Sequence, residues 1–137
     1  METNDVKAKE KEILKKIFIK EEDTLKDLDF IVEKCMKHFK INPTSDKKII
    51  LEKNINNISD KINLFLIGLY LMNKEDGSTL ASISLAGLNK TLSIKKTSLS
   101  KPLGILLNKG YVKKDNSGNY FIEHYKIKEI LESLENE

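Results

Sequence analysis

Arginine is absent from this 137-residue chain, so all 24 basic residues are lysines. Without a guanidinium group, the chain has no arginine finger, no bidentate arginine contact to guanine and no arginine to carboxylate fork. An AT-rich coding bias is the simplest cause of this composition. The absence excludes several common ways of holding phosphates, guanine bases and carboxylates.

Cysteine is nearly absent as well. Cys35 is the single cysteine, which excludes an intramolecular disulfide and any zinc site built from several cysteines. Its apolar sequence neighbours predict a thiol buried in the core.

Long apolar runs are also missing. The most hydrophobic stretch, residues 62–72, is about half the roughly 20 residues that a membrane-spanning helix needs, so it predicts a buried core helix. The opening residues METNDVKAKEKEILKK alternate charges and contain no apolar block of the kind found in secretory signals. We therefore expect no membrane partner and a cytoplasmic location.

Charge is unevenly distributed along the chain, although the net charge is only +3. Residues 1–77 carry 15 lysines and 15 acidic residues, and residues 123–137 carry two lysines and five glutamates. Residues 78–122 carry seven lysines and one acidic residue, Asp115. Positive charge confined to one segment is typical of a nucleic-acid-binding surface.

The first half of the chain predicts helices. Apolar spacing indicates one helix over residues 5–20 and a second after Thr24 as its cap. The apolar stripe of the second helix consists of Leu25, Leu28, Val32, Cys35 and Phe39. A break at residues 42–45 precedes a short predicted helix, capped by Ser45 and carrying Ile49, Ile50 and Ile55.

The second half predicts helices and a hairpin. One helix runs from Ser59 to the Asp76-Gly77 pair, and a strand-like run follows at residues 79–83. Ser84 caps a short helix, a turn spans residues 93–96, and Gly110 ends the next helix. Two β-rich segments around residues 115–118 then predict a hairpin. The last helix has an apolar stripe of Ile127, Ile130, Leu131 and Leu134.

Residues 59–122 resemble the winged helix-turn-helix domain of bacterial and archaeal transcription regulators of the MarR and ArsR type. The match rests on ISLAGLNKTLSIKKTSLSKPLGILLNKGYVKK, which has leucines at core positions and a serine-, threonine- and lysine-rich recognition helix. The resemblance implies a mainly α fold with a small β-hairpin wing. Residues 1–58 form an N-terminal helical region for packing or assembly in this scheme, and residues 123–137 form a C-terminal amphipathic helix.

The resemblance further implies a transcription regulator that binds double-stranded DNA. In such domains the outward part of the recognition helix enters the major groove, and the wing lies along the DNA. The implied DNA-binding residues are Lys90, Lys95, Lys96, Thr97, Ser98, Ser100, Lys101, Lys113, Lys114, Asn116, Ser117 and Asn119.

Two features depart from the family pattern. Pro102 and Gly104 fall inside the predicted recognition helix, where they cost about 3 and about 1 kcal/mol. We expect this helix either to begin late, near Ser98, or to be kinked. Because arginine is missing, we expect modest sequence specificity with an AT-rich preference.

Other functions are less well supported by the sequence. A winged helix can instead dock on another protein as an adaptor, and this alternative stays open. His38 and His124 form no metal-spaced pair, and no glycine-rich phosphate loop or serine elbow is present, so we expect no catalytic residue, cofactor or metal site. Helix and strand spacing predicts core positions, rather than base-stacking positions, for five aromatic residues: Tyr70, Tyr111, Tyr120, Phe121 and Tyr125.

The apolar stripes of the second and last helices require a cover. Each fully buried side chain of this size contributes about 1.5–3 kcal/mol, so both stripes must be shielded from water. They can pack within one chain or against a second copy. The resemblance favours a homodimer, because regulators of this type use flanking helices to dimerise.

Overall fold

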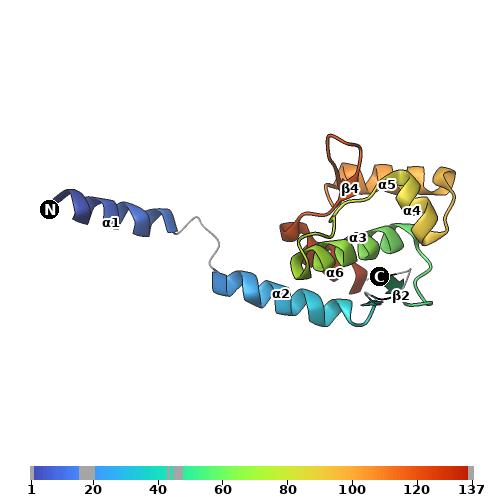
Figure 1. The fold of residues 1–137 in the computed structure, drawn as a ribbon, viewed down its shortest axis with the longest axis horizontal. Helices are drawn as coiled ribbons and strands as arrows, with labels where there is room; N and C mark the ends of the chain where they lie inside the picture. Colours follow the sequence, from blue (N-terminus) through green and yellow to red (C-terminus); the bar gives the residue numbers. More distant parts are fainter. Residues whose placement is uncertain (1, 16–20, 43, 45–47, 136–137) are drawn as a thin grey trace.

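The computed structural model of the chain describes residues 2–15, 21–42, 44 and 48–135 (Figure 1). Helices dominate these ranges, and the strands are short. The elements in order are α1 (Glu2–Lys15), α2 (Glu21–Cys35), β1 (Phe39–Ile41), β2 (Ile49–Leu51), α3 (Ile58–Glu75), α4 (Leu85–Leu92), α5 (Lys96–Lys109), β3 (Lys113–Lys114), β4 (Tyr120–Phe121) and α6 (His124–Glu135). The expected mainly α fold with a small β-hairpin is confirmed.

Helix α3 is the centre of the fold. Every residue from Ile62 to Gly68 is buried, and the helix contacts both hairpins as well as α5 and α6. Asn57 caps it by accepting a hydrogen bond from the Asp60 backbone amide at 3.3 Å. The prediction that residues 62–72 form a buried core helix is confirmed for its first seven residues, and the remaining four are half-buried.

The segment between α2 and α3 differs from the prediction. A hairpin stands where a helix carrying Ile49, Ile50 and Ile55 was expected, and it pairs Phe39 with Leu51 and Ile41 with Ile49. The helix prediction is wrong because β-branched isoleucines favour an extended backbone when a partner strand is available. The predicted cap Ser45 lies outside the described residues.

Helix α2 also differs in its ends and its buried face. Thr24 lies inside the helix rather than at its cap, and the helix ends at Cys35, so Phe39 belongs to β1. Ile31 and Cys35 are buried, one helical turn apart, whereas Leu25 and Val32 are exposed. The predicted stripe is therefore correct for Cys35, but the buried face of α2 includes Ile31 instead of Leu25 and Val32.

The last helix, α6, covers the buried face of α2. Ile127, Ile130 and Leu131 are buried, and α6 packs against both α2 and α3. Lys34 on α2 forms an ion pair with Glu135 on α6 at 2.7 Å. The stripe of α6 is thus covered within the same chain, whereas Leu25 and Val32 of the predicted α2 stripe stay exposed.

A hydrogen bond from α3 holds the start of α6. The Tyr70 hydroxyl on α3 and the Nδ1 atom of His124 are hydrogen-bonded, and Asp27 on α2 lies 3.9 Å from the Nε2 atom of this histidine. Burial raises the pKa of Tyr70. Three helices therefore meet at one histidine.

Helix α1 stands apart from the other elements in Figure 1. Residues 6–14 are all exposed, including Val6, Ile13 and Leu14. Part of the predicted helix, residues 16–20, lies outside the described ranges. In the described part of the chain, no helix is long and apolar enough to cross a membrane.

Residues 84–122 follow the predicted order of helix, turn, helix and hairpin. Ser84 caps α4 by accepting a hydrogen bond from the Gly87 amide at 3.0 Å, and Gly110 ends α5 with a φ of 76°. Of the strand-like run at residues 79–83, only Ile83 pairs, through two backbone hydrogen bonds with Tyr120. This bridge joins the segment before α4 to the β3–β4 hairpin.

Helix α5 begins at Lys96 and continues through Pro102. The expected late start near Ser98 is therefore wrong. Leu99, Leu103 and Leu106 anchor the helix in the core, and α5 packs against α3 and α4. Burial of these leucines offsets the cost of an internal proline.

The core predictions for Cys35 and the five aromatic residues have different outcomes. Cys35 is buried as expected, and burial raises the pKa of its thiol to about 12. Tyr120 is buried, and Tyr70, Tyr111 and Phe121 are half-buried. Tyr125 is 60% exposed, so its predicted core position is wrong. Its place in the first turn of α6 directs it away from the stripe that packs on α2 and α3.

Candidate nucleic-acid interface

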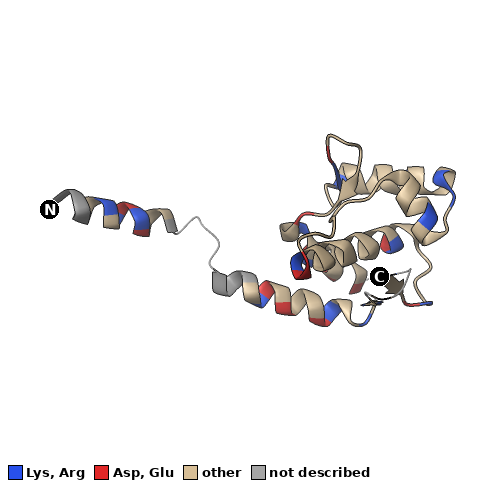
Figure 2. Ribbon diagram, viewed as in Figure 1, with Lys and Arg blue, Asp and Glu red and all other residues tan. Residues whose placement is uncertain are grey.

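Four exposed lysines gather around the turn between α4 and α5. Lys90 lies in the last turn of α4, Lys95 and Lys96 begin α5, and Lys101 follows on α5. No acidic residue lies within 4 Å of their amino groups among the described residues. Figure 2 shows blue without red at the end of α4 and at the start of α5, while the start of α3 in the same part of the view carries both colours. These charges are available to a polyanion.

The N-terminus of α5 adds to this positive field. Lys95 occupies the cap position but forms no side-chain cap hydrogen bond, and the first turn contains no acidic residue. Unpaired amides and the helix dipole already make such a terminus positive, and lysines there are unfavourable for the isolated helix. A phosphate at this terminus would satisfy both the amides and the lysines.

The turn that presents α5 has a defined geometry. Ser93 adopts a left-handed conformation with φ 56° and ψ 39°, which is uncommon for a residue other than glycine. The Asn89 side chain donates a hydrogen bond to the Ile94 carbonyl at 2.7 Å. These two residues hold the start of α5 in a fixed position relative to α4.

The polar residues of α5 differ in how free their side chains are. Thr97, Ser98 and Ser100 are all exposed, as predicted site residues should be. The Ser100 hydroxyl donates to the Lys96 carbonyl at 3.3 Å. In the described ranges, the hydroxyls of Thr97 and Ser98 have no such bond and can donate to a ligand.

The tip of the β3–β4 hairpin is organised by the single acidic residue of this segment. One carboxylate oxygen of Asp115 accepts hydrogen bonds from the amides of Ser117 and Asn119, both at 2.9 Å. Gly118 has a φ of 83°, which a residue with a side chain rarely adopts. Asn116 and Ser117 are exposed, and Asn119 is half-buried. The carboxylate is thus occupied in shaping the loop.

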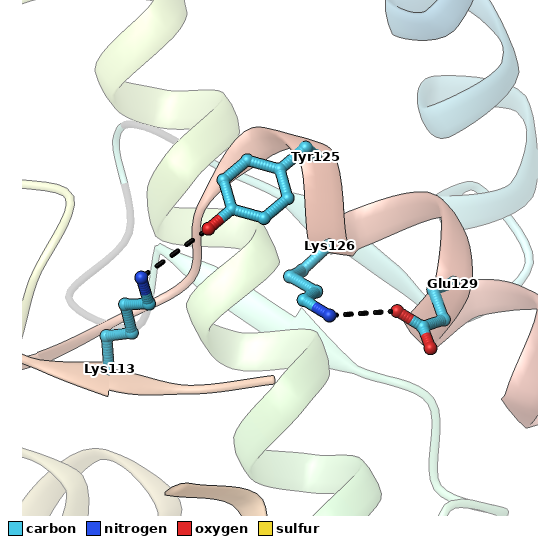
Figure 3. Close-up of polar contacts among 4 residues, drawn as sticks. All are labelled: Lys113, Tyr125, Lys126 and Glu129. Carbon is cyan, nitrogen blue, oxygen red and sulfur yellow. Dashed lines mark hydrogen bonds and ion pairs between the residues drawn. The ribbon is translucent and has the colours of Figure 1, made fainter. Parts of the chain in front are cut away.

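The two hairpin lysines are less free than the four at the turn. Lys113 forms an ion pair with Glu123 at 2.8 Å. It also donates a hydrogen bond to the Tyr125 hydroxyl at 3.4 Å, which Figure 3 shows. The hydrogen bond from Lys113 lowers the pKa of Glu123, and the bond to Glu123 raises the pKa of Lys113. Lys114 lies over the Tyr120 ring at 5.4 Å. Both are exposed, but each already has an intramolecular partner.

Comparison with known proteins gave no relative. No family model, curated protein or solved structure matches the chain. The interface is therefore judged on its own residues.

Sequence reasoning overlooked the last two turns of the outward face of α5. Ile105, Asn108 and Lys109 are exposed there, on the same helix as the predicted contacts. The helical repeat was a sufficient signal, because residues three and four apart share a face and Lys101 was already placed outward.

Proposed function

We propose that residues 59–122 form a winged helix-turn-helix domain and that the chain binds double-stranded DNA as a transcription regulator. In this proposal α5 is the recognition helix and the β3–β4 hairpin is the wing. The order of α3, the Ile83 bridge, α4, α5 and the hairpin is the order that such a domain requires, which supports the proposal.

One observation carries the DNA-binding proposal. Four exposed lysines without acidic partners, in the part of the chain that the structure describes, surround the uncapped N-terminus of α5. Such an arrangement opposes helix stability and favours an anionic ligand. A repeating polyanion with a groove wide enough for a helix is the ligand that fits both the charge and the shape.

The test is the salt dependence of duplex binding. Replacing Lys95 and Lys96 with alanine should weaken binding to all duplexes and reduce the slope of log affinity against log salt by about 1.8 per subunit, at about 0.9 per lost phosphate contact. Fluorescence anisotropy at several salt concentrations measures this slope.

A matched double variant controls for net charge. Lys37→Ala with Lys40→Ala removes two exposed lysines, from the turn after α2 and from β1, and it should leave the slope unchanged. Equal effects of both double variants would reduce the binding to a general charge effect. Absence of any duplex binding by the full chain would reject the proposal and favour the adaptor alternative.

The proposal includes a homodimer, since a two-fold protein matches a two-fold DNA site. The buried faces of α2 and α6 pack on each other, so an interface would use exposed apolar side chains, of which Val6, Ile13 and Leu14 lie on α1 and Leu25 on α2. Light scattering at micromolar concentration tests this part separately. A monomer mass would reject the dimer and leave DNA binding untouched.

A further inference from the structure

The outward face of α5 carries polar residues, one apolar residue and a glycine. Leu99, Leu103 and Leu106 point into the core, so the opposite face of the helix carries Thr97, Lys101, Ile105 and Asn108, at intervals of three and four residues. These four outward residues would form the contact surface for any ligand that packs against α5.

Ile105 is the apolar member of this row. Its side chain is 43% exposed, and its neighbours on the row are a lysine and an asparagine. A polar residue here would fit the exposed face of a helix better. The protein covers more than half of this side chain, and a ligand that touches this face would cover the rest.

Gly104 lies beside Ile105 and is not needed by the fold. A Cβ atom added at this position would meet nothing within 4 Å, and the glycine has no positive φ. Gly87, in contrast, has the Ile83 side chain at 2.4 Å from such an atom. Glycine is among the poorest helix formers, so at position 104 it lowers stability without an internal reason. A ligand that approaches the α5 backbone closely would explain why position 104 is a glycine.

We propose that Ile105 contacts the C5-methyl group of thymine in the major groove and that Gly104 permits this close approach. The inference rests on the proposed DNA binding and adds the base that α5 selects. The methyl group is the one apolar feature on the major-groove edge of a base pair, and apolar side chains are its usual partners. Lysines at the start of α5 hold the phosphates while Ile105 distinguishes the base.

The test compares thymine with deoxyuridine, which differs only in lacking this methyl group. The full chain should bind an AT-rich duplex about fourfold more tightly, per bound subunit, than the same duplex with deoxyuridine, because one buried methyl contributes about 0.8 kcal/mol. Ile105→Ala should reduce the ratio of the two affinities toward one without changing the salt slope. Gly104→Ala should raise the melting temperature of the protein and weaken binding to the thymine duplex.

Ile41→Ala serves as the matched control, because Ile41 is 37% exposed on β1, away from α5. It should retain the preference for thymine. Equal affinity of the unaltered protein for both duplexes would overturn the role of Ile105 while leaving DNA binding in place. Failure to bind either duplex would overturn both.

Discussion

At the scale of single residues, the contact between Lys113 and Glu123 decides how much of the hairpin's charge reaches a ligand. Their charged groups are 2.8 Å apart and partly exposed, so the pair contributes little to stability. In the proposed complex its effect is on DNA binding instead, because Glu123 would compete with a phosphate for the amino group of Lys113.

Replacing Glu123 with glutamine should therefore strengthen duplex binding and raise the salt slope by about 0.9, the value for one added phosphate contact. Salt-dependent anisotropy measures both changes. Glu129→Gln is the matched control, because it removes the same charge and frees Lys126, 3.3 Å away on α6 (Figure 3). If both variants gain equally, Lys113 has no particular role.

The same pair should also respond to acid. Because the pKa of Glu123 is lowered by Lys113, the contact is complete above the ordinary glutamate pKa and is lost as pH falls through the lowered value. Below that pH, the protonated Glu123 side chain should no longer compete with DNA phosphates for the Lys113 amino group.

Cys35 predicts a loss of stability at high pH, whereas the Lys113–Glu123 contact is lost at low pH. Its thiol has a pKa of about 12 in the folded chain and about 8.5 when unfolded. As pH rises above the unfolded value, the unfolded chain loses a proton that the folded chain keeps, so the free energy of unfolding should fall. Denaturant titrations between neutral and alkaline pH should show this fall in the unaltered protein. A fall of equal size in Cys35→Ala would assign it to other groups.

At the scale of elements, the sequence identified those whose ends carry local signals. Ser84 and Gly110 act through hydrogen bonds and backbone angles within a few residues, so the sequence reveals them directly. The β1–β2 hairpin has such a signal only at its turn, where Asn42 Oδ1 accepts a hydrogen bond from the Thr44 amide at 3.1 Å. Its strands have three residues each, and Phe39 shows its strand character only by pairing with Leu51 across an intervening loop.

The candidate site shows the same division. Exposure of the α5 residues followed from helical spacing, because leucines at core positions fix which face points outward. The partners of Lys113 did not, since Glu123 and Tyr125 reach it only after the hairpin and α6 are placed in space. A charged residue's sequence position predicts its element, but its free charge depends on tertiary neighbours.

Two left-handed residues, one at the C-terminal end of α4 and one at the C-terminal end of α5, predict opposite stability changes. Gly110→Ala should lower the free energy of unfolding by about 1 kcal/mol, because a side chain is disfavoured at a φ of 76°. Ser93→Gly should raise it by about 0.5–1 kcal/mol by relieving the same strain. Thermal or denaturant unfolding measures both.

Gly77→Ala is the control for this pair, because a Cβ atom there meets nothing within 4 Å and its φ is not positive. It should be neutral or slightly stabilising. A loss of stability at position 77 equal to that at position 110 would show that backbone conformation is not the cause.

At the scale of the whole molecule, the packing of α2 on α6 distinguishes a core from an interface. Leu131 is 1% exposed, so Leu131→Ala should lower the free energy of unfolding by about 2–5 kcal/mol. Because its cover comes from the same chain, this loss should not depend on protein concentration. Melting temperatures over a range of concentrations measure it.

Leu80→Ala provides the comparison, because Leu80 is 73% exposed in the loop between α3 and α4. It should change stability by less than about 0.5 kcal/mol. A loss at Leu131 that grows on dilution would mean that a second chain covers α6.

The α2 and α6 contact also bears on the order of events during synthesis. Lys34 and Glu135 form their ion pair from opposite parts of the chain, about 100 residues apart. A ribosome adding roughly 5–20 residues per second needs about 5–20 s to reach α6 after completing α2. During that interval the apolar side chains of Ile31 and Cys35 lack their final cover, so the nascent chain is most exposed to aggregation and to chaperones before α6 emerges.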